Sequence, residues 1–427
     1  MIVNKNFSIK NQFKKNKIHK NNSTDNIYNI IENVPFINQE TSFYCHFACL
    51  TMILKYYGIN VTLDEILYNS GIGYSLMYPN PKNKYFPVAG YTISQSLIDC
   101  KFIANLYGFI YEYWSANIIN SDDQCWQQFL YNVKQNIQYD IPVKITVNSY
   151  YLNSLKNKSK YVFKSRINKL YRWVFKFISS THAILLVGID EDEDKICYVD
   201  PATKLKNLTD NHYQWISIIN LRKAMKVQKL KNNFYRYSIE IFKKDNIPLS
   251  KKQIFENAHN RNIKRMKGFM NFYDKKYKYN KFGFNALKLL KNNLEKEFMN
   301  PIPLRFKLIC LRYFLVYKIS NFFNFRSSNN ELKYFNPFGE LTIEKHNTIK
   351  YLMKNIRVYK MYQQEINLLK EELENWDLLI TYFSKFIEKN VFLKTFYAQQ
   401  LLNKIILLID KIILIEEKIT SLQNKSA

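Results

Sequence analysis

The sequence predicts an α+β domain followed by an all-helical domain, and three features of the chain indicate this order. A cysteine opens an apolar helical segment near residue 45. Apolar strand patterns follow, two of them carrying a histidine and an aspartate at their ends. Beyond residue 250, glycine and strand signals nearly vanish and helical periodicity takes over. We therefore expect a disordered basic tail at 1–27, an α+β domain at 28–247 and a helical domain at 248–427.

The composition allows a sizeable core and carries a large positive charge. The chain has 427 residues, 47% of them hydrophobic, and 63 Lys and Arg against 35 Asp and Glu give a formal net charge of +28. Such a balance favours an acidic partner. It is also typical of a compositional bias in which Lys, Asn, Ile and Tyr are all abundant. We find no nucleic-acid-binding motif.

Six cysteines form no dense framework and no C-x-x-C pair, so neither a zinc site nor a disulfide scaffold is expected. Reduced thiols in a cytoplasmic protein are the simplest interpretation. The basic N-terminus lacks the apolar segment of a signal peptide. No uncharged apolar run reaches 18 residues, and we expect no membrane-spanning helix.

The N-terminal half is organised by capping and turn signals. Apolar periodicity predicts a first helix at about 45–57, ended by Gly58. A second helix should begin after Thr62 as N-cap and end at Gly71. A third is expected over 92–107, ended by Gly108. Strand patterns lie at 141–152, 182–190, 195–200 and 235–242, and helical patterns in the C-terminal half at 251–300, 303–324 and 341–420.

Cys45 has the local setting of a nucleophile. A thiol on the first turn of a helix lies in the positive field of the helix N-terminus, which favours the thiolate. Gln39 stands six residues upstream, and its side-chain amide can donate to an oxyanion that forms at the thiolate. Cys49, one turn later, is the better candidate for a buried core residue.

His182 and Asp200 are the candidates for the base and its orienting group. His182 opens one strand, and Asp200 ends the next strand after an acidic turn at 191–194. If Ile189 pairs with Lys195 across this turn, Ile184 pairs with Asp200. His182 and Asp200 then lie diagonally on one face of the sheet, with Cβ atoms about 7–8 Å apart or less. The constellation depends on this register, because a slip of one residue would place them on opposite faces.

The order Cys45, His182, Asp200 is that of papain-like enzymes, and it implies acyl transfer: Cys45 attacks, His182 shuttles the proton, Asp200 orients the imidazole, and Gln39 holds the oxyanion. Taken singly, each residue has a commoner structural role, and it is their joint occurrence that indicates a site. His46 competes as a base, but adjacent side chains on a helix diverge by about 100°. We interpret it as a loop-packing or substrate-pocket residue.

Around these residues the sequence resembles the papain-like cysteine peptidases that process bacteriocin leaders, over roughly 34–204. The motifs are Gln39-x5-Cys45 with a helix ending in YYG, then HAILLVGID and YVDPA. One departure is His46, where those peptidases usually have Gly. His46, the GIG loop at 71–73 and ISIINLRKA at 216–224 are more similar to the N-terminal domain of butirosin biosynthesis protein H. That resemblance implies a papain-like fold followed by a helical domain, with Gly73 and Tyr74 as further pocket candidates.

The second resemblance implies an amide-forming acyltransferase that takes an acyl group from a carrier-protein thioester in secondary-metabolite biosynthesis. An acidic acyl or peptidyl carrier protein would then be the partner, a small amine or peptide the acceptor, and the phosphopantetheine thioester a substrate. No metal or organic cofactor is implied. Two alternatives remain open: a cysteine peptidase that cleaves a leader or small peptide, and an inactive papain-like binding scaffold. The acyl group, the acceptor and the oligomeric state are not encoded in any motif that we recognise.

Overall fold

The computed structural model describes thirteen segments of the chain, and all structural statements below concern these residues: 28–39, 44–74, 76–78, 94–95, 99–116, 120–152, 181–203, 211–226, 237–269, 281–297, 339–355, 363–392 and 396–422. The expected tail at 1–27 and the helical pattern at 303–324 lie outside them.

Within the described residues, seven antiparallel strands form the main sheet in the order β4-β9-β5-β6-β7-β8, with β1 pairing with β6. A smaller sheet has the order β10-β2-β3. The strands are β1 (Tyr28–Ile30), β2 (Leu76–Tyr78), β3 (Ser94–Gln95), β4 (Phe109–Ser115), β5 (Val143–Asn148), β6 (Thr181–Asp190), β7 (Lys195–Val199), β8 (Tyr213–Ser217), β9 (Ser238–Lys244) and β10 (Lys281–Phe282).

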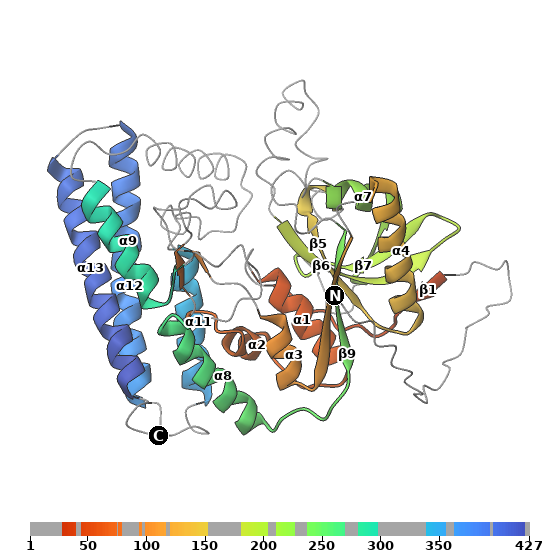
Figure 1. Ribbon diagram of the computed structural model, residues 1–427, viewed down its shortest axis with the longest axis horizontal. Coiled ribbons are helices and arrows are strands. Elements are labelled where there is room, and N and C mark those ends of the chain that lie inside the picture. Colours follow the sequence, from red (N-terminus) through yellow and green to blue (C-terminus); the bar gives the residue numbers. More distant parts are fainter. Residues whose placement is uncertain are drawn as a thin grey trace, which may run out of the picture.

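The described helices lie in both halves of the chain. Figure 1 shows α1, α2 and α3 between the main sheet and the C-terminal helices, while α4 packs on β6 and α7 on β5. They are α1 (Cys45–Tyr56), α2 (Leu63–Asn69), α3 (Cys100–Leu106), α4 (Asp122–Gln138), α7 (Ile218–Lys226), α8 (Lys251–Met266), α9 (Phe284–Glu297), α11 (Gly339–Asn355), α12 (Gln363–Phe392) and α13 (Phe396–Leu422). A short 3-10 turn, Ser149–Tyr151, follows β5.

Capping signals were reliable guides to α1 and α2 but not to α3. The Thr62 hydroxyl accepts from the backbone N–H of Glu65 at 3.2 Å, as expected for an N-cap. The third helix begins at Cys100 rather than near residue 92, with Asp99 as the N-cap that accepts from Phe102. Ser94 and Gln95, expected to be helical, form β3 instead. Asp99 caps the helix inside the segment that apolar periodicity predicts to be one continuous helix.

The β6–β7 hairpin corrects the predicted pairing at the turn and keeps it at the other end. Ile189 pairs with Ile196, and Lys195 pairs with Asp190, so the assumed Ile189–Lys195 pair was wrong. A β-bulge between Leu186 and Gly188 then shifts the register, and Leu185 pairs with Val199 as the hypothesis requires. One extra residue in β6 thus offsets the shorter turn.

The hydrophobic core crosses the predicted boundary at 247/248. One buried cluster contains α1, α2 and the main sheet, and it continues into α8, α11 and parts of α12 and α13. A second cluster lies among α9, α12 and α13. Buried polar contacts join the halves as well, since the Tyr74 hydroxyl donates to Glu365 of α12 at 3.1 Å. The helical half is therefore packed onto the α+β half rather than tethered to it.

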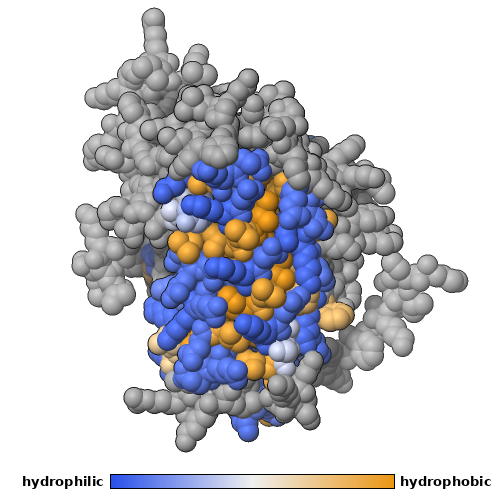
Figure 2. Space-filling view, turned by 90° about the vertical axis from the view of Figure 1, so that its left-hand side faces the viewer, coloured by the Kyte–Doolittle hydropathy of each residue, from blue (hydrophilic) through white to orange (hydrophobic). Residues whose placement is uncertain are grey.

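The outer face of the helical half carries an apolar stripe between hydrophilic residues (Figure 2). Leu407 and Leu414 of α13 are exposed large apolar side chains of the helical half, at 62% and 56%. The stripe does not amount to a membrane segment, because no helix in the described part of the chain is long and apolar enough to cross a bilayer.

A matched pair of glycines tests the packing of α8 against α2. Gly58 and Gly71 both have a left-handed φ, +83° and +80°, but only Gly71 is crowded. A Cβ at Gly71 would lie 2.8 Å from Asn262 Oδ1 and would also meet the buried Arg265 guanidinium, whereas a Cβ at Gly58 meets nothing within 4 Å. We expect Gly58→Ala to lower the free energy of unfolding by about 1–2 kcal/mol. Gly71→Ala should cost about 1–3 kcal/mol more.

Denaturant unfolding of the two variants, followed by circular dichroism, measures this difference. Equal losses of stability would show that the contact between α8 and Gly71 is looser than described.

Candidate active site

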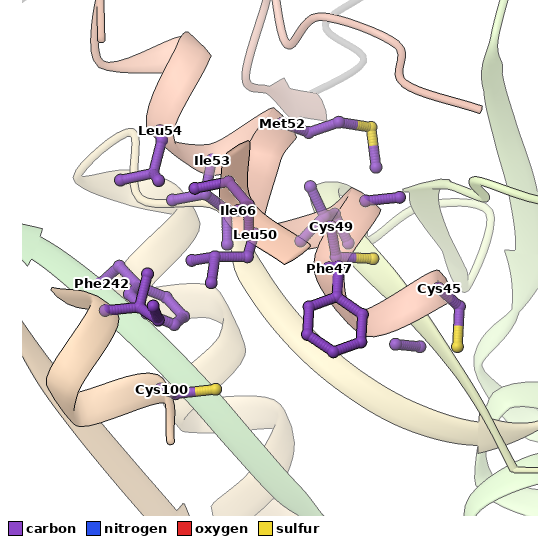
Figure 3. Close-up of a cluster of buried hydrophobic side chains, with 14 of the residues drawn as sticks. Cys45, Phe47, Cys49, Leu50, Met52, Ile53, Leu54, Ile66, Cys100 and Phe242 are labelled. Atoms are coloured by element: carbon purple, nitrogen blue, oxygen red, sulfur yellow. The ribbon is translucent and has the colours of Figure 1, made fainter. Parts of the chain in front are cut away.

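Cys45 is the first residue of α1 and is 4% exposed. The N-cap, Tyr44, makes no side-chain hydrogen bond to the first turn. The first-turn N–H groups therefore direct their positive field at the thiol without competition from a capping side chain. Figure 3 shows Cys45 at the start of the helix, with Cys49, Leu50 and Ile53 following it among apolar side chains. The buried stripe of α1 thus fixes the end of the helix that carries the sulfur.

His182 and Asp200 are in direct contact. The hydrogen bond joins His182 Nε2 and Asp200 Oδ1 at 2.7 Å, with His182 5% and Asp200 0% exposed. Asp200 Oδ1 also accepts from the backbone N–H of Ala202 at 2.8 Å, which orients the carboxylate. Because Nε2 is engaged by Asp200, Nδ1 is the ring nitrogen left to face the thiol of Cys45, with which His182 also hydrogen bonds.

The contacts shift the pKa values of Cys45 and His182 in opposite directions. Burial alone would raise the pKa of the Cys45 thiol, but the hydrogen bond and charge of His182, the backbone N–H of Ala183 and the charge of Lys144 lower it overall. Burial alone would lower the pKa of His182, yet its bonds to Asp200 and Cys45 raise it to about 10. Both shifts favour the form of the pair in which Cys45 is a thiolate and His182 an imidazolium.

Gln39 is tied to the same corner through its backbone. Its N–H donates to the carbonyl of Pro201 at 3.0 Å, next to Asp200. Its side chain is half-buried, and Oε1 is buried without a hydrogen-bond partner among the described residues. Residues 40–43, which link it to Cys45, lie outside the described segments. The group that would donate to an oxyanion is the Nε2 amide of Gln39, and this role stays a prediction; the bond to Pro201 anchors the residue beside Asp200.

His46 is half-buried beside the nucleophile and is held neutral. Burial lowers its pKa to about 3, with the charges of Lys144 and His182 acting in the same direction and Glu240 against them. An imidazole with so low a pKa is a weak proton acceptor at neutral pH. This favours His182 as the base and leaves His46 as an uncharged hydrogen-bonding group at the site.

The two further pocket candidates lie in the turn after α2. Gly73 has a φ of +83° and is buried. Tyr74 is 0% exposed, and its hydroxyl is committed to Glu365, so its role is to join the turn to α12. No contact of either residue with Cys45 or His182 is found among the described residues, and their assignment to the pocket stays a prediction.

Sequence reasoning missed two charged residues close to the site, Lys144 and Glu240. They face each other on neighbouring strands β5 and β9 and form a buried ion pair of 2.8 Å. A signal was present, because each charge stands between two apolar residues of its strand, Val143 and Ile145 for Lys144 and Ile239 and Ile241 for Glu240, and the two charges are opposite. Within the described residues, no group of three or more His, Cys, Asp or Glu side chains is arranged to hold a metal ion.

Comparison with known proteins supports the same type of site. Residues 31–229, which carry Cys45, His182 and Asp200, match the model of the Peptidase_C39 like family. No curated protein matches the chain. The family match, together with the antiparallel sheet and its helices, supports a papain-like α+β fold and a cysteine peptidase-like enzyme. The general resemblance found in the sequence is thereby confirmed, and the likeness to the butirosin branch stays a prediction.

The ion pair predicts an unusual pH dependence for the alkylation of Cys45 by iodoacetamide. The thiolate exists above the lowered pKa of Cys45 and is lost only as the pH falls through that value. Alkylation should therefore remain fast at pH values below the usual thiol pKa of about 8.5. Burial raises the pKa values of Cys49, Cys100 and Cys197, so their labelling should be slow. Mass mapping of the adduct identifies the labelled site.

His182→Ala is the informative variant, because it removes the cation while Cys45 keeps its place on α1. Its alkylation should need alkaline pH. A wild-type profile rising only above about pH 8 would exclude the ion pair.

Proposed function

We propose that the protein is an amide-forming acyltransferase that carries an acyl group as a thioester on Cys45 and passes it to an amine. The observation that carries the proposal is the chain of contacts from Cys45 through His182 to Asp200, buried where β6 begins and β7 ends. Such a set supplies a nucleophile, a proton shuttle and an orienting carboxylate.

The reaction has two balanced halves. The Cys45 thiolate attacks the carbonyl of an acyl thioester, and the oxyanion is held by the backbone N–H of Cys45 and the side chain of Gln39. The intermediate collapses, the C–S bond to the carrier breaks, and the departing thiolate takes the proton of imidazolium His182. An amine then attacks the Cys45 thioester, His182 accepts its proton, a C–N bond forms and the Cys45 thiolate is released.

Burial of the site supports an amine as the acceptor rather than water. Cys45, His182 and Asp200 are each at most 5% exposed, and a site that limits water protects an acyl thioester from hydrolysis. The neutral imidazole of His46 offers an uncharged acceptor for an amine N–H. A donor on an acidic carrier protein suits the net charge of +28, because opposite charge speeds encounter.

The second candidate function is a cysteine peptidase that cleaves a leader or small peptide, and the family match at 31–229 favours it. The two functions share the attack by Cys45 and differ in the bond that is broken and in the final acceptor. An inactive binding scaffold is the third alternative, and it would form no covalent intermediate.

Intact mass spectrometry separates the three functions. After incubation with an acyl-pantetheine thioester, we expect a mass increase equal to one acyl group, mapped to Cys45 and absent from Cys45→Ala. Added amine should discharge the adduct as an amide faster than buffer hydrolyses it. Discharge to water alone, together with cleavage of test peptides, would favour the peptidase, and the lack of any adduct or cleavage would leave the scaffold.

Substitution of the two candidate proton-handling neighbours assigns their roles. Asp200→Asn should lower the acylation rate about 10²–10⁴-fold, because the imidazole loses both its orientation and the stabilisation of its charge. His46→Ala should leave acylation within a few-fold of wild type and act on amine discharge. Single-turnover kinetics measures both steps, and a His46→Ala enzyme unable to acylate would make His46 the base.

A further inference from the structure

A buried ion pair lies in the centre of the main sheet, and the proton transfers above do not use it. Lys144 Nζ and Glu240 Oε2 are 2.8 Å apart, with side chains 1% and 14% exposed. The carboxylate also accepts from the Tyr111 hydroxyl at 3.2 Å. The ammonium reaches the Cys100 sulfur at 3.8 Å. Both groups stay charged, since burial is outweighed by their mutual attraction: the pKa of Lys144 is raised and that of Glu240 is lowered.

The strand register brings Lys144 close to the part of the sheet that contacts the nucleophile. Thr146 of β5 is directly opposite Ala183 of β6, whose backbone N–H bonds the Cys45 thiol. Lys144 lies two residues before Thr146, so both side chains point to the same face of the sheet, about 7 Å apart along the strand. Its charge lowers the pKa of Cys45 and of His46. The pair and the first turn of α1 are therefore electrostatic neighbours.

Stability alone is a weak reason for such a pair. The free energy lost when two charges leave water offsets much of the free energy gained from their mutual attraction. Apolar residues of similar size often stabilise a core as well or better. The neighbours of the two residues along β5 and β9, Val143, Ile145, Ile239 and Ile241, are apolar and buried. A buried cation next to a reactive anion has a function that an apolar side chain cannot supply.

We propose that Lys144, held in place by Glu240, is a positioning residue that stabilises the Cys45 thiolate. The reactive sulfur then has two cations near it, His182 in hydrogen-bond contact and Lys144 at longer range. This inference rests on the proposed role of Cys45 as the nucleophile.

The other titratable groups around Cys45 also influence the charge of its sulfur. His182 of β6 favours the thiolate most strongly, after the opposing effect of burial. Cys49 and His46 on α1 are uncharged, because burial raises the pKa of Cys49 and lowers that of His46. Asp200 and Glu240 are the anions in this network. Glu240 faces Lys144 directly, so the cationic end of the pair is the end that acts on Cys45.

The test is a titration of the Cys45 thiolate in the full chain, followed by ultraviolet absorbance near 240 nm. The titration curve of the Cys45→Ser variant is subtracted as the background. In Lys144→Met/Glu240→Gln, which removes both charges and keeps a hydrogen-bonding group for Tyr111, the titration midpoint of Cys45 should move up. Its alkylation below the usual thiol pKa should slow roughly tenfold.

The matched control is Lys243→Met/Glu112→Gln, which removes a second Lys–Glu pair from β9 and β4. Lys243 Nζ and Glu112 Oε2 are 2.7 Å apart, close to the 2.8 Å of the Lys144–Glu240 pair, but these side chains are 41% and 44% exposed. Removing this pair should leave the Cys45 titration unchanged. Lys144→Gln, whose amide can still donate to Glu240, serves if the double variant does not fold, and it should shift the midpoint in the same direction.

An unchanged midpoint in folded Lys144 variants overturns this inference, even if Cys45 forms acyl adducts. A shifted midpoint in a protein that forms no adduct supports the electrostatic role and rejects the proposed acyl transfer instead.

Discussion

The hydrogen bond between His182 and Asp200 is the constraint on which the rest of the site depends. It joins the start of β6 to the residue just beyond β7, so it exists only if the two strands keep one register at this end. The bulge between Leu186 and Gly188 provides that register. The same corner anchors Gln39 through Pro201 and orients Asp200 through Ala202. A shift of one residue in β7 would remove all of these contacts together.

The nucleophile reaches this corner because the core holds α1 against β6. Residues Phe47 to Leu54 of α1 are buried, and the helix starts at the residue that carries the sulfur. Burial by itself disfavours a thiolate, so the charge on Cys45 needs partners: His182, the Ala183 N–H and the helix N-terminus, to which we add Lys144. The helical half of the chain contributes to the same core through α8 and α11. Its packing therefore supports the helix that bears Cys45.

Much of the fold and of the candidate site could be predicted from the sequence, for reasons that differ between elements. Cys45, His182 and Asp200 were found because helix caps, strand ends and their chain order are local patterns. The predicted partner of Ile189 was wrong, because the apolar pattern of β6 does not reveal that a bulge adds one residue to this strand. The start of α3 was misplaced because Ser94 and Gln95 form a strand through pairing with a distant segment. The role of Tyr74 depends on Glu365, a residue 291 positions away, and the Lys144–Glu240 pair depends on strands 96 positions apart. Such partners are set by topology, which no single window of sequence contains.

The central claim is that the resting site is an ion pair in which His182 carries the proton. The nitrogen NMR spectrum of ¹⁵N-histidine-labelled protein tests it most directly, with the His182 signals assigned by their loss in His182→Gln. We predict that at about pH 8 both ring nitrogens of His182 are protonated, and that they titrate only as the pH approaches the raised pKa of about 10. A His182 ring that is already neutral at that pH, with a titration near the ordinary value of about 6.5, would contradict the account.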